Sequence, residues 1–73
     1  MLTFYLEARP HMNGRLVEFT IYRGSHAGEK SPLGQPTIFE RAEWETFRTL
    51  IIADIKNSRI PTELHDGTRR EKP

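Results

Sequence analysis

Side chains able to take part in catalysis or metal binding are few in this chain and form no known motif. The three histidines, His11, His26 and His65, fall in turn or loop contexts and lack the close helical spacing of a metal-binding pair. Ser25 and Ser31 are not flanked by the G-x-S-x-G pattern of a nucleophilic serine. We therefore expect the histidines to be surface residues and predict no role for either serine in catalysis.

Carboxylates and glycines give no stronger signal for catalysis or nucleotide binding. Glu7, Glu18 and Asp54 are each explained more simply as solvated or ion-paired surface groups. The glycines between residues 24 and 34 form neither a Walker phosphate-binding loop nor a dinucleotide fingerprint. The sequence therefore predicts a protein that is not an enzyme and that holds no metal ion or cofactor.

Length, charge and composition restrict the class of protein further. The chain has 73 residues, with eleven Lys and Arg against ten Asp and Glu, and it has no cysteine. A domain of this size has a small core, and oligomerisation is a common remedy. The balanced charge does not by itself indicate nucleic-acid binding, and no apolar run approaches the ~20 residues that a membrane span requires. We expect a cytoplasmic protein that does not enter a membrane.

The pattern of residues in the N-terminal third of the chain predicts a β-hairpin. The runs LTFYLEAR and RLVEFTIYR alternate apolar and polar residues, as half-buried strands do. Asn13-Gly14 between them is the favoured pair for a tight hairpin turn. Opposing residues then have numbers that sum to 27, so that one face pairs apolar residues such as Leu6 with Ile21, while the other pairs Tyr5 with Tyr22. Pro10 argues against regular pairing near the turn, since proline has no backbone N–H to donate to the neighbouring strand.

A long amphipathic helix is predicted from Thr37 to Asn57. Thr37 and Glu40 match a capping box. Four apolar residues then recur at spacings of three and four and predict the face toward the core, namely Trp44, Phe47, Ile51 and Ile55. Arg48 falls on the opposite side. Leu50 and Ile52 flank the apolar stripe, which indicates either deeper burial under loops or a contact with a partner or second copy.

These elements define an α+β fold. We expect an antiparallel hairpin of two to three strands packed on one long C-terminal helix, in the order β-β-(β)-α. Residues 24–36 are rich in Gly, Ser and Pro and predict a functional loop or one that hides a short third strand around residues 35–38. We expect residues 1–65 to form a single domain and residues 66–73 to be a disordered polar tail.

The residue types exposed by this arrangement favour binding over catalysis. We expect a small protein-interaction module, assembled as a homodimer, that binds and masks a surface of a larger partner as an adaptor or inhibitor, a class that includes phage proteins. Tyrosine and arginine dominate interface energies. The candidate interaction residues are Tyr5, Arg9, Tyr22, Arg23, Arg48, Leu50 and Ile52. The plainer interpretation is that Tyr5 and Tyr22 simply pair on a solvated sheet.

A second hypothesis is single-stranded nucleic-acid binding. The strand VEFTIYR, followed after a loop by the Trp-bearing helix in PTIFERAEWETFRTLI, loosely resembles the positive cofactor four family, whose dimers bind unpaired DNA on curved sheets. The resemblance implies Tyr5 and Tyr22 as a stacking platform, with basic residues near phosphates, namely Arg9, Arg15, Arg23 and Lys30. Glu7 and Glu18 would share that face and would repel a phosphate backbone.

Overall fold

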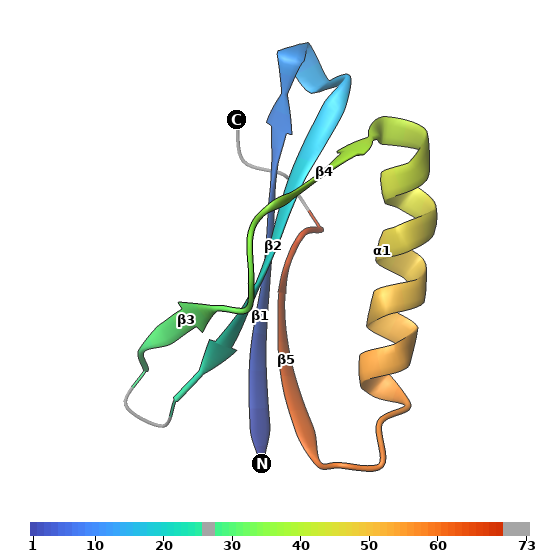
Figure 1. Cartoon of the computed structure of the whole chain (residues 1–73). Coiled ribbons are helices and arrows are strands. Elements are labelled where there is room, and N and C mark those ends of the chain that lie inside the picture. Colours follow the sequence, from blue (N-terminus) through green and yellow to red (C-terminus); the bar gives the residue numbers. More distant parts are fainter. Residues whose placement is uncertain (26–27, 70–73) are drawn as a thin grey trace.

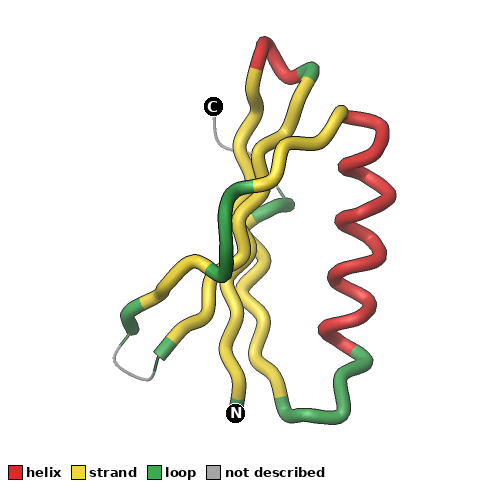
Figure 2. The backbone as a smooth tube through the Cα atoms, in the orientation of Figure 1, coloured by secondary structure: helices red, strands yellow, loops and turns green. Residues whose placement is uncertain are grey.

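The computed structural model describes residues 1–25 and 28–69 of the chain. These residues form a five-stranded mixed sheet with a helix against one face (Figure 1, Figure 2). The elements follow in the order β1 (Leu2–His11), β2 (Leu16–Gly24), β3 (Lys30–Pro32), β4 (Thr37–Glu40), α1 (Arg41–Lys56) and β5 (Thr62–Gly67), with a short 3-10 turn, Met12–Gly14, between β1 and β2.

The predicted hairpin register of β1 and β2 is confirmed. Leu6 lies opposite Ile21 and Tyr5 opposite Tyr22, with the pairing running to His11 and Leu16 at the turn. The connection is wider than the Asn-Gly pair alone. Leu2 N–H donates to Pro61 O at 3.0 Å, so even-numbered residues of β1 direct their backbone groups toward β5. Pro10 therefore points away from β2, and the missing N–H costs the hairpin no hydrogen bond.

The fold class α+β is correct, but the expected C-terminal position of the helix is wrong. β5 follows α1 and pairs in parallel with β1, so the sheet order is β3 and β4 beside β2, then β1, then β5. Helix α1 therefore joins strands at opposite edges of the sheet and lies along one of its faces (Figure 1). Asp66 and Gly67, expected in a disordered tail, end β5. Residues 70–73 of that predicted tail lie outside the described residues.

The predicted capping box and the predicted start of the helix are also wrong. Thr37–Glu40 is extended and pairs with residues 16–19 of β2. The helix begins at Arg41, after Glu40 at φ −70° and ψ 150°, and no side chain caps it. Backbone pairing with β2 takes precedence over the local cap, because Phe39 is then packed against the core. Residues 24–36 contain the short strand β3, whereas the expected third strand at residues 35–38 is displaced to β4.

The core lies between α1 and the sheet face that it covers. Its buried members are Leu6, Ala8, Val17, Phe19 and Trp44. Ile21 and Phe47, both predicted in the core, are partly buried against it, while Phe4 and Ile51 are half-buried. Phe19 holds strand and helix together, with its ring centroid 5.2 Å from Trp44 and 5.5 Å from Phe47.

Candidate functional site

The sheet face that points away from α1 carries the polar and aromatic side chains of the central strands. We call it the outer face. Because side chains alternate along a strand, β1 and β2 contribute every second residue to it. Its members include Tyr5, Glu7 and Arg9 from β1, Glu18, Thr20 and Tyr22 from β2, and Glu63 and His65 from β5.

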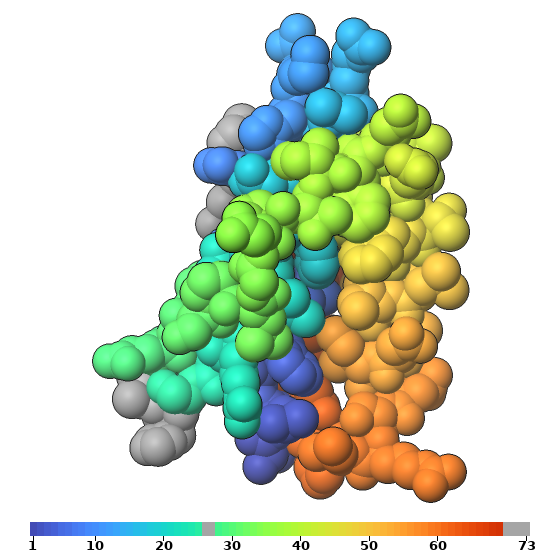
Figure 3. Space-filling view, viewed as in Figure 1, coloured from blue at the N-terminus to red at the C-terminus, as the bar shows by residue number. Residues whose placement is uncertain are grey.

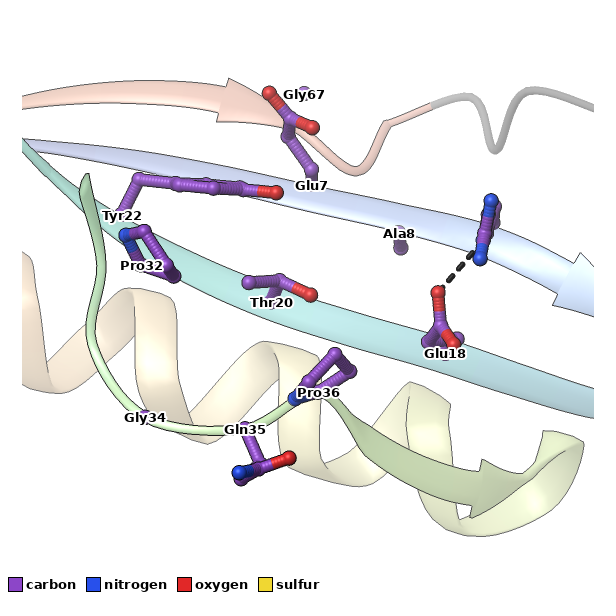
Figure 4. A pocket seen from close by; sticks show the side chains of 11 residues that line it. Glu7, Ala8, Glu18, Thr20, Tyr22, Pro32, Gly34, Gln35, Pro36 and Gly67 are labelled. Carbon is purple, nitrogen blue, oxygen red and sulfur yellow. Dashed lines mark hydrogen bonds and ion pairs between the residues drawn. The ribbon is translucent and has the colours of Figure 1, made fainter. Parts of the chain in front are cut away.

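A groove runs along part of the outer face. Its volume is about 670 Å³. One side is the β1–β2 surface and the other is the segment between β3 and β4, as Figure 4 shows. The lining residues are Glu7, Ala8, Arg9, Glu18, Thr20, Tyr22, Pro32, Gly34, Gln35, Pro36 and Gly67.

The wall of the groove arises from an irregularity at the edge of the sheet. Tyr22 pairs with Pro32 and Phe19 with Thr37, so residues 20–21 of β2 face the four residues 33–36 of the neighbouring segment. The excess residues bulge out of the ladder, a device common at sheet edges near binding sites. Gly34 adopts φ +90°, which favours glycine, within this bulge. In Figure 3 the chain from β3 to α1 forms a continuous ridge over the surface.

Both carboxylates of the groove are ion-paired. Glu18 accepts a hydrogen bond from Arg9 Nε at 2.6 Å, and its other oxygen lies 3.2 Å from His11 Nε2. The hydrogen bond with Arg9 lowers the pKa of Glu18. Lys30 donates to Glu7, and this hydrogen bond raises the pKa of Lys30. The groove is therefore polar yet locally neutral.

The aromatic rings of the outer face form a second polar cluster beside the groove. Tyr5 stacks on His65 with ring centroids 4.5 Å apart and an angle of 12° between the planes. Lys30 Nζ lies 4.8 Å from the ring centroid of Tyr22 and 5.7 Å from that of Tyr5. The cluster connects β1, β2, β3 and β5 across the outer face.

The structure brings together three of the seven predicted interaction residues. Tyr5, Arg9 and Tyr22 share the outer face. Arg23 follows Tyr22 in β2, so strand alternation places it on the opposite face, where it is exposed. Leu50 lies on α1 and is 61% exposed. Arg23 and Leu50 therefore do not belong to the groove.

Arg48 and Ile52 make contacts within the chain instead of facing a partner. Arg48, expected on the solvated side of the helix, donates from Nη2 to Asp66 Oδ2 at 2.8 Å and from Nε to Thr68 Oγ1 at 2.8 Å. Thr68 is 3% exposed. Ile52 packs against the core. The helix lies close enough to the end of β5 that the long arginine side chain reaches back to it, so helical periodicity alone misplaced Arg48.

Sequence reasoning missed the contribution of His65 and the bulge at residues 33–36, and it named Lys30 only as a phosphate contact in the nucleic-acid hypothesis. The alternation of Glu63 and His65 around Leu64 was the available signal for β5. His26 lies outside the described residues. Within residues 1–25 and 28–69, no three His, Asp or Glu side chains are placed to hold a metal ion. No helix in the same ranges is long and apolar enough to cross a membrane.

Comparisons with known proteins add no assignment: no family model, curated protein or solved structure matches the chain.

Proposed function

We propose that this chain is a non-enzymatic protein-interaction module that binds an extended segment of a partner protein in the outer-face groove. The groove, with one wall formed by residues 33–36, is the observation that carries the proposal. By occupying part of the partner, the module masks a surface of it and acts as an adaptor or inhibitor. A homodimer is the proposed assembly, because a domain of 73 residues buries little surface alone.

The chemistry of the groove supports a polypeptide ligand. Tyr22 offers a large ring, and Pro32 and Pro36 offer rigid apolar surfaces that lose little conformational entropy on binding. The Arg9–Glu18 pair supplies both a hydrogen-bond donor and an acceptor. Glu18 is held ionised by Arg9, which lowers its pKa, whereas a general acid at neutral pH requires a raised one. These features suit binding better than catalysis.

Single-stranded nucleic acid is the second candidate ligand. The ion pairs of Glu7 with Lys30 and of Glu18 with Arg9 support it, because they compensate the carboxylates that would repel phosphate. The contacts of the two tyrosine rings favour a protein ligand over nucleic acid. Tyr5 already stacks on His65, and Lys30 lies near the rings of both tyrosines. A base would have to displace these contacts before it could stack.

A photo-crosslinking amino acid at Thr20 tests the proposal. Thr20 lies on the floor of the groove, and Thr49 on the exposed surface of α1 is the matched control. In cells that express the protein, we expect Thr20 to crosslink to one polypeptide and Thr49 not to do so, as identified by mass spectrometry. Crosslinking to nucleic acid would support the second candidate, and equal yields at both positions would refute the groove as the binding site.

A substitution that fills the groove is a second test of the proposed binding site. Thr20→Trp adds a ring on the outer face without touching the core, and Thr49→Trp adds the same ring on the helix. We expect the first variant alone to lose the crosslinked partner in a competition experiment. Retention of the partner by Thr20→Trp would contradict the proposal.

A further inference from the structure

We propose that the free edge of β5 pairs antiparallel with the same edge of a second copy, so that two sheets become one across a two-fold axis. The inference rests on the homodimer of the proposed function but not on the groove. It names the surface that the second copy occupies, and that surface differs from the helix residues Leu50 and Ile52 that the sequence indicated.

The outer edge of β5 has backbone groups available for pairing. Within the described residues, β5 pairs with β1 alone. The hydrogen bond from Leu2 N–H to Pro61 O shows that odd-numbered residues of this segment face β1. The even-numbered residues Thr62, Leu64 and Asp66 therefore direct N–H and C=O outward. Such a row is a template for another strand.

The opposite edge of the sheet is protected, which leaves β5 as the edge suited to pairing. There the ladder is broken by the bulge at residues 33–36, and Pro32 and Pro36 lack an N–H. Bulges and prolines are the usual protection of sheet edges. The strand Thr62–Gly67 contains neither. We therefore expect a second copy to pair with β5 and not with the edge formed by β3 and β4.

The pairing of a carboxylate with an imidazole selects one register for the two strands. When Leu64 lies opposite Leu64 of the second copy, each Glu63 lies opposite a His65. A shift of two positions in either direction places Glu63 opposite Glu63 or His65 opposite His65. A shift of one position would exchange the two faces of one strand. Self-complementarity about a single residue is what an isologous two-fold interface requires.

This register adds contacts on both faces of the joined sheet. Leu64 packs against the core on the helix side, so the two leucines join the two cores across the axis. On the outer face, His65 Nε2 lies 2.9 Å from Glu63 Oε1 of its own chain, and the pairing adds a second carboxylate to each imidazole. The outer faces of both copies then form one continuous surface.

Charge reversal tests the register. Sedimentation velocity over a concentration series gives the dissociation constant of the dimer. We expect Glu63→Lys and His65→Glu each to raise it about tenfold or more, because the first loses the carboxylate that faces the imidazole of His65 and the second places two carboxylates opposite each other. The double variant restores complementarity and should return close to the wild-type value. Glu29→Lys makes the same charge change beside β3, at the other edge, and should have no effect.

Removal of an outward N–H tests the strand pairing itself. Thr62→Pro deletes a donor on the free edge and leaves the hydrogen bonds between β5 and β1 in place. We expect weaker dimerisation with an unchanged circular dichroism spectrum. In a dimer of mixed labelled and unlabelled chains, the register predicts a cross-peak between the Hα of Glu63 and the Hα of His65 of the other copy.

The outcomes separate this inference from the groove. A chain that stays monomeric up to about 1 mM overturns it, as does a dimer unaffected by both Glu63→Lys and Thr62→Pro. A dimer whose double variant, Glu63→Lys with His65→Glu, does not recover overturns the register. Thr20→Trp should leave the dimer intact while it blocks the groove, so either proposal can fail alone.

Discussion

Arg48 fixes the end of β5 to the helix through a set of satisfied polar contacts. It binds both Asp66 and Thr68, and Thr68 N–H donates to Asp66 Oδ1 at 2.9 Å. These groups lie at the edge of the core, where an unpaired polar atom is costly. Arg9 and Glu18 make an ion pair of similar geometry on the outer face, but Arg9 is far more exposed than Arg48. The two arginines therefore contribute differently to stability.

Arg48→Ala should lower the free energy of unfolding by about 1–3 kcal/mol, because Asp66 and Thr68 lose their charged partner in a half-buried site. Urea denaturation followed by the fluorescence of Trp44 measures the change. Arg9→Ala is the matched control and should have a smaller effect, since Arg9 is largely exposed and Glu18 keeps His11 as a second partner. Equal effects of the two substitutions would contradict this role for Arg48.

Asp66 should make stability depend on acid pH. Burial, the largest single effect, opposes its ionisation, but the hydrogen bonds from Thr68 and the charge of Arg48 together lower its pKa below the ordinary 3.8. The unfolded chain then binds more protons than the folded one as the pH falls. The stabilisation is complete above about pH 4 and is lost as the pH falls through the pKa of the folded state.

Asp66→Asn should remove this contribution, so that the difference from the wild type is largest near neutral pH and shrinks on acidification. Urea denaturation between about pH 2.5 and pH 6 measures it. Glu18, whose pKa Arg9 also lowers, remains in both proteins and cancels in the comparison. A difference that stays constant over the whole range would show that the ionisation of Asp66 does not contribute.

At the scale of the elements, β5 is tightly fitted to the central strand at its end. A Cβ added to Gly67 would lie 2.7 Å from the carbonyl oxygen of Leu6. That contact is with backbone, which moves only if the strand pairing shifts. The end of β5, which carries Asp66 to Arg48, therefore depends on glycine at this position.

Gly67→Ala should destabilise the protein by about 1–3 kcal/mol, the usual cost of overpacking. Amide hydrogen exchange should show the loss concentrated at the end of β5, with the β1–β2 hairpin still protected. Leu64, three residues earlier, retains its packing against the core. Protection lost evenly over the whole sheet would contradict a local clash.

The elements also show which parts of the fold the sequence could specify. The hairpin was predictable because alternation and the turn residues agreed on one register. β4 was not, because Thr37 and Glu40 also fit a helix cap and only pairing with β2 decides between the two. β5 was not predicted because it has one apolar residue, Leu64, and its last two residues, Asp66 and Gly67, were assigned to the polar tail. The groove depends on the bulge at residues 33–36, which the sequence indicated only as part of a loop over residues 24–36 and not as a break between paired strands.

The whole molecule has one core, and it lies on one side of the sheet. Helix α1 covers the inner face, while in the described structure no element covers the outer one (Figure 2). Small domains of this kind have little stability to spare. Association with a second copy through β5 would stabilise the folded state by mass action.

The melting temperature should therefore rise with protein concentration in the wild type. Calorimetry between about 10 μM and 1 mM measures this, because a folded state that dimerises is favoured at high concentration. Glu63→Lys should flatten the dependence, while Glu29→Lys should leave it unchanged. A melting temperature independent of concentration in all three proteins would argue against a dimer that contributes to stability.

The bulge at residues 33–36 has a practical consequence for studying this protein. Leu33 N–H still donates to Ile21 O at 2.9 Å, but residues 33–36 fall outside the regular strand pairs, and Leu33 and Gln35 are exposed. Because the flanking pairs hold β3 and β4 in place, short peptide grafts here should be accommodated without a change elsewhere. The chain has no cysteine, so one introduced at position 35 would accept a single fluorescent dye beside the groove. Such a labelled protein would report directly when a ligand arrives.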